Sequence, residues 1–235
     1  MQLFYASDIQ SNQALLTEEE SHHCMKVLRL PQGSVIQITD GRGHIFEAVI
    51  RQLQGKNAEL EILRTLKTQT PKNYFIHIAL APTKQIDRTE WFIEKSVEIG
   101  IQEITMLLCE NSERKQVKIE RLEKIAISAM KQSGQIYLPK INALTPFQDL
   151  VGRSSSGDQK LIAYVDEKNQ DFLGNILRKN CSYCILIGPE GDFSTNEIML
   201  ALNNGFQAVS LGKQRYRTET AGLVACHISN LVHEM

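Results

Sequence analysis

The 235-residue chain has no surplus of charge of either sign. It carries 26 Lys and Arg residues against 27 Asp and Glu residues, for a formal net charge of −1. A general basic field that would attract nucleic acid is therefore excluded, and any RNA binding must use a local basic patch. The apolar fraction of 42% is nevertheless high enough to bury a core, which excludes extensive disorder.

Long apolar runs are also missing. No stretch approaches the roughly 20 residues that a membrane-spanning helix needs, so we expect no membrane partner. Residues 1–8 lack the basic start and the apolar stretch of a signal peptide. The five cysteines are an odd number, which together with the missing export signal fits a reduced setting. We therefore expect a cytoplasmic protein.

The spacing of Cys181 and Cys184 is that of a redox or zinc-binding pair. A redox pair would place its first cysteine at a helix N-terminus, but this pair leads into the apolar run 185–187. A structural zinc site would need a second ligand pair at suitable spacing, and the sequence offers none, so we expect no metal. Both thiols are predicted to pack in a strand. A thiol oxidoreductase is kept as the weakest functional alternative.

The first 68 residues are rich in short strand-like runs. Two runs, 35–39 and 44–50, flank the Asp40-Gly41 signal of a hairpin, and a third run, 58–63, alternates apolar and polar residues. A helix is predicted over 17–28, with Thr17 as N-cap and Glu20 completing a capping box. Short strands plus one helix indicate a small barrel. The polar segment 65–73 is predicted to be a linker.

From residue 74 onward, strand-like runs alternate with helical patterns. The alternation predicts an α/β domain with a mostly parallel sheet that is covered on both faces. Ser194 and Glu197 form a second capping box, which marks the start of a helix. The expected strands are 74–81, 104–109, 161–165, 183–187 and 208–211, and the expected helices are 87–99, 119–132, 147–151, 170–177, 195–203 and 218–232.

Two glycine-bearing turns follow strands of this predicted sheet. The first comprises residues 188–192, Gly-Pro-Glu-Gly-Asp, and the second runs from 211 to 220. In open parallel sheets, ligands bind beyond the carboxyl ends of the strands, and glycine lets the backbone approach a ligand closely. Neither turn has the Walker pattern or the G-x-G-x-x-G fingerprint. The spacing alone leaves a ligand site and an ordinary pair of strand-to-helix turns as alternatives.

These turns resemble the RsmE family, which are ribosomal RNA methyltransferases of the SPOUT superfamily. The similarity rests on residues 185–191, on Leu211-Gly212 and on 217–221, Arg-Thr-Glu-Thr-Ala, and it covers nearly the whole chain. Further matches lie at His23 with Val27, Leu28 and Arg29; at Lys84, Asp87 and Arg88; at Glu94 and Lys95; at 98–101; and at Ser112, Glu113 and Arg114.

The resemblance implies a fold, an activity and partners. A PUA-like β-barrel that binds RNA would occupy residues 1–68, and a knotted SPOUT α/β methyltransferase domain would occupy 74–235. The implied methyl donor is S-adenosyl-L-methionine, and the implied acceptor is N3 of a uridine in 16S rRNA of the small ribosomal subunit. The resemblance also implies a homodimer formed through the C-terminal domain.

The chemistry of the acceptor suggests roles for two residues beside the donor loop. We hypothesise that Arg217 stabilises charge that develops on the uracil oxygens, and that Glu219 orients Arg217 or acts at the N3 proton; capping of the last helix is an equal alternative for Glu219. The implied cofactor-binding residues are Ile187, Gly188, Pro189, Glu190, Gly191, Leu211, Gly212, Tyr216, Arg217 and Thr218. Local basic patches are the expected RNA contacts, with Lys26 and Arg29 on one helical face, and His23 either packs between the domains or touches RNA. The candidate RNA contacts are His23, Lys26, Arg29, Lys84, Arg88, Arg114 and Lys115.

Four positions depart from the family pattern. Lys131 replaces a glutamate and Gln135 an arginine, which alters an RNA contact or an ion pair at that helix end. Asp192 stands where a second glycine is usual, and Tyr216 replaces a leucine, which reshapes the cofactor pocket. These departures keep a second class open, a non-catalytic RNA-binding protein of the same fold. The only tryptophan, Trp91, has a spacing that favours a core or dimer contact over base stacking.

Overall fold

The computed structural model describes residues 2–54, 56–152, 159–164 and 171–235. The chain divides into two compact units. The N-terminal unit contains the residues up to 71 together with 130–138, and the C-terminal unit contains 72–129 together with 139–235. The division falls within the helix α3 (Ile119–Ser133), so the chain passes between the units three times.

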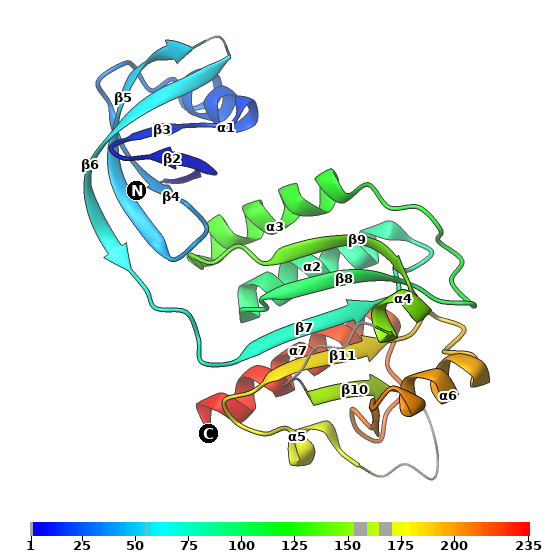
Figure 1. Cartoon of the computed structure of the whole chain (residues 1–235). Helices are drawn as coiled ribbons and strands as arrows, with labels where there is room; N and C mark the ends of the chain where they lie inside the picture. The colour runs from blue at the N-terminus through cyan, green and yellow to red at the C-terminus, as the bar shows by residue number, and fades with distance from the viewer. Residues whose placement is uncertain (1, 55, 153–158, 165–170) are drawn as a thin grey trace. The chain divides into compact units, whose positions relative to one another are not determined.

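The N-terminal unit is built on one six-stranded sheet with the order β1-β4-β5-β6-β3-β2 (Figure 1). The strand β1 pairs with β4 in parallel, and the other neighbours are antiparallel. The predicted hairpin is confirmed as the antiparallel pair β4–β5. Phe4, Leu16, Ile38, Ile50 and Leu60 are fully buried in its core. The strands are β1 (Leu3–Tyr5), β2 (Asp8–Gln10), β3 (Gln13–Leu15), β4 (Val35–Thr39), β5 (His44–Gln54) and β6 (Asn57–Thr68).

The predicted linker begins too early. Residues 65–68 belong to β6, and Thr68 pairs with His44 at the start of β5. These side chains are exposed, so the segment lacks the apolar signal of a buried strand. Backbone pairing with β5 is what makes it a strand, and composition does not reveal that pairing.

The predicted helix 17–28 is present, but its second half is π-helical. It consists of α1 (Glu18–His22) and the π-helical turn η1 (His23–Val27). Thr17 is the N-cap as predicted, because its Oγ1 accepts a hydrogen bond from the Glu20 backbone N–H at 3.3 Å. The Glu20 carboxylate does not complete a capping box but accepts from the Tyr5 N–H and pairs with Lys131. Arg29 has a φ of 55° outside the helix, so it does not share a helical face with Lys26.

The C-terminal unit has an entirely parallel six-stranded sheet with the order β12-β10-β11-β7-β8-β9. Figure 1 shows the arrowheads of β7, β8, β10 and β11 at the same edge of the sheet. The edge strand β9 was not predicted, since Ile141 is its only buried residue and the others are half-buried or exposed, with polar side chains among them. The strands are β7 (Phe75–Leu80), β8 (Glu103–Leu108), β9 (Lys140–Pro146), β10 (Gln159–Ala163), β11 (Ser182–Ile187) and β12 (Gln207–Val209).

Helices cover both faces of this sheet, as predicted. On one face, Phe147 and Val151 of α4 and Ala201 of α6 pack with the buried side chains of β7, β8, β10 and β11. On the other face, α7 packs against α2 and β7. The helices are α2 (Ile86–Ile99), α3 (Ile119–Ser133), α4 (Phe147–Val151), α5 (Leu173–Ile176), α6 (Thr195–Asn203) and α7 (Thr218–Glu234).

Most predicted boundaries in this unit agree with the structure to within two residues, and the capping box of Ser194 and Glu197 is confirmed. The helix expected over 170–177 is reduced to α5; residue 170, like residue 165 of an expected strand, lies outside the described residues. No described helix has the length and apolar character needed to cross a membrane. The implied knot stays a prediction, because strand order does not record how the chain is threaded.

Candidate functional site

Four loops meet at the carboxyl edge of the parallel sheet. They follow β7, β8, β11 and β12 and lead into or toward α2, α3, α6 and α7. This edge is where ligands bind in open parallel sheets, because the loops diverge there and leave backbone groups accessible. Both glycine-bearing turns found in the sequence belong to this set.

The turn after β11 explains the family departure at Asp192. This residue has a φ of 63°, in the left-handed region where glycine is usual and where Asp is among the tolerated side chains. Its N–H donates to the Pro189 carbonyl at 2.9 Å, and its Oδ1 accepts from the Phe193 N–H at 2.8 Å. At Gly188, a Cβ would lie 3.2 Å from the Phe193 ring. Asp192 therefore preserves the backbone path of a glycine at this turn.

Side chains from the neighbouring loops hold this turn in place. The Asn111 Nδ2 donates to the carbonyls of Gly191 at 3.3 Å and Asp192 at 3.1 Å. The Glu190 Oε1 accepts a hydrogen bond from the Lys84 backbone N–H at 3.0 Å. Sequence reasoning missed Asn111; the only available signal was its position shortly after a buried strand. Glu190, which was expected to hold cofactor through its backbone, uses its side chain to fix the loop after β7.

The turn after β12 is tied directly to the first turn. The Thr218 Oγ1 donates to the Gly188 carbonyl at 3.0 Å. Gly212 has a φ of 135°, and a Cβ there would lie 3.5 Å from the Tyr216 hydroxyl. Leu211 is half-buried, whereas Gly212, Tyr216 and Arg217 are exposed at the surface of the unit. The structure thus brings the two predicted cofactor turns together through one hydrogen bond.

The first turn of α7 places a carboxylate beside the cofactor turns. Glu219 follows Thr218 and is 7% exposed. Its Oε1 lies 3.9 Å from the Arg88 Nε, and its Oε2 is buried without a hydrogen-bond partner. The cation that faces Glu219 is therefore Arg88 of α2. Arg217 precedes α7 as its exposed N-cap residue and makes no side-chain capping bond.

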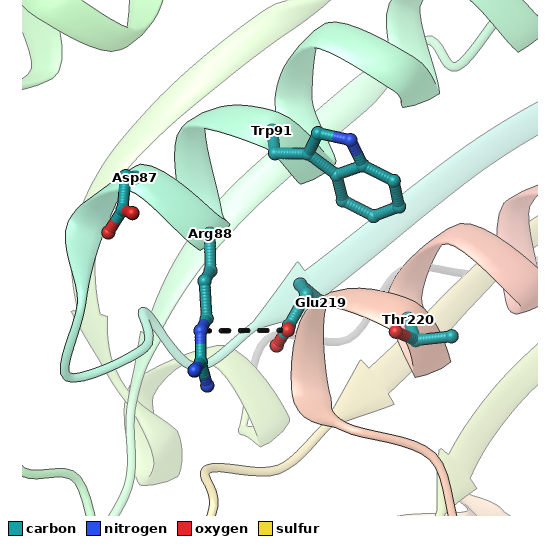
Figure 2. A pocket seen from close by; sticks show the side chains of 5 residues that line it. All are labelled: Asp87, Arg88, Trp91, Glu219 and Thr220. Atoms are coloured by element: carbon teal, nitrogen blue, oxygen red, sulfur yellow. Dashed lines mark ion pairs between the residues drawn. The ribbon is translucent and has the colours of Figure 1, made fainter.

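A pocket of about 380 Å³ opens between α2 and α7 (Figure 2). Figure 2 shows the Arg88 and Glu219 side chains pointing toward one another, with the Trp91 ring on the same side of α2. Trp91 is 41% exposed, so of its two predicted roles the core position is wrong and the dimer contact stays a prediction. The core residue is its neighbour Phe92, which is fully buried. The lining residues are Asp87, Arg88, Trp91, Glu219 and Thr220.

Two of the predicted RNA contacts form hydrogen bonds or ion pairs with the loops after β7 and β8. Arg114 donates from Nε to the Thr83 carbonyl at 2.9 Å and from Nη2 to the Lys84 carbonyl at 2.5 Å. The Lys84 Nζ forms an ion pair with Glu113 at 2.7 Å, and that hydrogen bond raises the pKa of Lys84. Lys115 is exposed. Lys84 and Arg114 thus join the loops after β7 and β8, a role that sequence spacing did not predict.

Three of the predicted RNA contacts lie in the N-terminal unit. The His23 ring is half-buried, meets the Phe4 ring edge-on and has its Nε2 2.8 Å from the Gln2 Nε2. Lys26 and Arg29 are exposed. These contacts give His23 a packing role in its own unit and leave the two basic side chains at the surface.

The cysteines are free and mostly buried. Burial is the main cause that raises the pKa of Cys24 to about 11 and that of Cys226 to about 12, and it raises the pKa of Cys109 further. Cys184 packs in the strand β11, as predicted, and Cys181 precedes that strand. Among the described residues, no group of three His, Cys, Asp or Glu side chains could hold a metal ion.

Comparison with known proteins identifies the family. An RNA methyltransferase domain model matches residues 70–230, and an RNA methyltransferase PUA domain model matches 16–63. A ribosomal RNA small subunit methyltransferase E from Mesomycoplasma hyopneumoniae is 31% identical over 95% of this chain and 96% of its own length. The chain belongs to the ribosomal RNA small subunit methyltransferase E family. This finding confirms the resemblance to the RsmE family that the two turns carry.

Solved structures agree with membership of the RsmE family. A probable rRNA methyltransferase from Porphyromonas gingivalis is 44% identical and superimposes with a TM-score of 0.88, covering 100% of this chain and 99% of that one. A ribosomal RNA small subunit methyltransferase E from Neisseria gonorrhoeae, solved bound to S-adenosyl methionine, is 29% identical with a TM-score of 0.86 and covers 99% of this chain and 98% of that one. The expected fold class, an α/β methyltransferase domain with a PUA-like domain, is confirmed.

The departure at Lys131 also has a structural explanation. Its Nζ forms an ion pair with Glu20 of α1 inside the N-terminal unit, where the Lys131 side chain is 23% and the Glu20 side chain 9% exposed. A lysine here therefore neutralises a buried carboxylate. The change relative to the RsmE pattern supplies an ion pair within this unit.

Proposed function

We propose that this protein transfers a methyl group from S-adenosyl-L-methionine to N3 of a uridine in 16S rRNA of the small ribosomal subunit. The observation that carries the proposal is the hydrogen bond from Thr218 to Gly188, which joins the two glycine-bearing turns at the carboxyl edge of the sheet. The family membership supports the same activity. A relative of similar fold is solved with the same cofactor bound.

The residues of the two turns fit this cofactor. Positions 188, 191 and 212 carry no side chain, and Cβ atoms at the first two would already contact Phe193 and Asn111. The bare backbone of 187–191 and 211–212 would hold the adenosine part, and Tyr216, Arg217 and Thr218 would close over the donor. When bound, the cofactor supplies an electrophilic methyl group on a sulfonium. The turns contribute by positioning the donor, and positioning can supply much of the lowering of the activation barrier in a methyl transfer.

The acceptor requires help from charged side chains. Uracil N3 carries a proton at neutral pH, so a base must remove it, or cations must stabilise charge on the adjacent oxygens. Arg217 is exposed next to the turns and is proposed to stabilise that charge. Glu219 is proposed to act at the proton, because one of its oxygens is free of protein partners. Its contact with Arg88 replaces the proposed contact with Arg217.

The partners are proposed from the same evidence. Residues 1–68 would serve as the RNA-binding domain and 74–235 as the methyltransferase domain, with His23, Lys26, Arg29, Arg88 and Lys115 as RNA contacts. Lys84 and Arg114 would contribute through the loops that they hold together. The proposal includes a homodimer formed through the C-terminal domain. It also includes a cytoplasmic location, because the proposed substrate is ribosomal RNA.

The test combines cofactor binding and methylation. Calorimetry should show binding of S-adenosyl-L-methionine to the wild type, and its absence would favour the non-catalytic alternative. Small subunits from cells that lack this protein should lack one methyl group on a 16S uridine and should gain it when incubated with the purified protein and S-adenosyl-L-methionine, read by mass mapping. In single-turnover assays, Arg217→Ala should be strongly impaired, whereas Arg215→Ala, a matched exposed arginine in the same turn, should not. A rate for Arg217→Ala within a few-fold of wild type would remove Arg217 from the chemistry.

A further inference from the structure

The pocket between α2 and α7 has features that the cofactor turns do not use. Its volume of about 380 Å³ lies in the range of small-molecule sites. It combines an exposed aromatic ring, Trp91, with the buried Oε2 of Glu219, which has no hydrogen-bond partner, and with a cation, Arg88. A buried acceptor without a partner is costly, and that cost is recovered if a ligand donates to it.

We infer that this pocket receives the target uracil, with Trp91 as the stacking platform and Arg88 and Glu219 as readers of its polar edge. The inference rests on the proposed function, because it assigns a place to that reaction's acceptor. An aromatic side chain that is 41% exposed at a pocket offers one free face to a base. Single-stranded or flipped-out bases are recognised in this way, by stacking and by hydrogen bonds to the Watson–Crick edge.

The charges of the pocket match uracil in particular. The uracil edge presents the O4 acceptor, the N3–H donor and the O2 acceptor in sequence. Glu219 is an acceptor for the N3–H, and Arg88 is a donor for one of the flanking oxygens. Cytosine has an acceptor at N3 instead of a donor, so it would meet the carboxylate with repulsion. In the pose that places N3 against Glu219, which methylation of N3 requires, the pair of Arg88 and Glu219 therefore favours uracil over cytosine.

The same arrangement serves the chemistry. The N3 proton passes to the Glu219 carboxylate, and the electron pair left on N3 forms the bond to the methyl carbon as its bond to sulfur breaks. The neutral thioether leaves, and the proton on Glu219 is then lost to water. Arg88 stabilises the negative charge that spreads onto the oxygens. Glu219 adjoins Thr218, which is bonded to Gly188 of the cofactor turn, so donor and acceptor sites are neighbours in this fold.

The single tryptophan permits a direct test that does not depend on activity. Because Trp91 is the only tryptophan, intrinsic fluorescence reports on this pocket alone. A short single-stranded RNA with one central uridine is titrated in the presence of S-adenosylhomocysteine. Quenching is expected with the uridine oligonucleotide, and clearly less with the same oligonucleotide carrying cytidine or an abasic site at that position. Equal quenching by all three would overturn the inference.

Variants separate the roles. Stacking on one base predicts that Trp91→Ala raises the KM for RNA by roughly 5- to 150-fold, while Trp91→Phe stays within a few-fold of wild type. Glu219→Gln should abolish the preference for uridine in fluorescence titrations, whereas Glu98→Gln, a carboxylate at the other end of α2, should keep it. Circular dichroism confirms that each variant is folded.

The remaining outcomes are also decisive. If Trp91→Ala leaves the KM unchanged but converts a dimer to monomers in analytical ultracentrifugation, Trp91 is a subunit contact and the inference fails. If the wild type methylates rRNA without uridine-dependent quenching, only this inference fails and the proposed function stands. If the wild type neither binds the donor nor methylates, the proposed function fails, and uridine-specific quenching would then support the pocket as a base-binding site alone.

Discussion

Gly222 offers a stringent test of the packing between α7 and the elements beside it. It lies in the interior of α7, where glycine is normally unfavourable. A Cβ at this position would lie 2.5 Å from the Leu80 Cδ1 and 2.7 Å from the Phe92 Cε2. Carbon atoms in favourable contact are about 3.5–4.0 Å apart, so the added methyl group overlaps both neighbours by roughly 1 Å.

The magnitude for Gly222→Ala follows from two opposing terms. Alanine in a helix interior is favoured over glycine by about 1 kcal/mol. Overpacking a core typically costs about 1–3 kcal/mol, and the upper half applies here because Leu80 and Phe92 are both fully buried and cannot move aside. The net expectation is a loss of about 1–2 kcal/mol, which corresponds to a fall in Tm of roughly 2–8 °C for a chain of this size.

Thermal unfolding followed by circular dichroism measures this effect. Gly222→Ala should lower the Tm less in the Phe92→Leu background than in the wild type, because the smaller side chain makes room for the methyl group. A Tm for Gly222→Ala above that of the wild type would show that helix propensity dominates. The close approach of α7 to β7 and α2, which positions Glu219, would then be refuted.

Three further predictions concern single side chains. Lys131→Met should reduce the free energy of unfolding in urea by about 3 kcal/mol, because it leaves the Glu20 carboxylate buried and uncompensated, and adding Glu20→Gln should recover most of that loss. Asp192→Gly should be nearly neutral in Tm, whereas Asp192→Val should cost about 1–2 kcal/mol at a φ of 63°. Burial is the main cause that lowers the pKa of His233, which stacks on Tyr74. The free energy of unfolding should therefore be highest above the ordinary histidine pKa and should fall as the pH drops from there toward the lowered pKa of the folded protein. His233→Phe should remove this pH dependence in urea titrations.

Much of the C-terminal fold could be predicted because its strands and helices carry strong local patterns. The buried run of β11 and the capping box of Ser194 and Glu197 are examples, since both depend on neighbouring residues alone. The strand β9 and the end of β6 could not be found, because few or none of their side chains are buried and only pairing with another strand defines them. Local composition carries no information about such pairing.

The candidate site likewise combines features that local sequence predicts with features that only tertiary structure defines. The two glycine-bearing turns were visible because glycine and proline have conformational signatures of their own. The role of Asn111 was not visible, since an asparagine after a strand is common and its partners, the carbonyls of Gly191 and Asp192, are about 80 residues away in sequence. Likewise, Lys84 and Arg114 suggested RNA contacts by charge, while their bonds to neighbouring loops depend on tertiary structure.

Glu219 shows why the partner of a charged residue is the hardest feature to predict. Proximity in sequence pointed to Arg217, two residues away, yet α7 turns the carboxylate inward to face Arg88 of α2, 131 positions earlier in the chain. At 3.9 Å this pair is too long for a hydrogen bond, and the other carboxylate oxygen has no partner. An unsatisfied buried acceptor costs about 1–3 kcal/mol, a penalty that a fold carries at few places. In a chain whose neighbouring loops are otherwise closely bonded to one another, that cost marks the start of α7 as the place where a donor from outside the protein should bind.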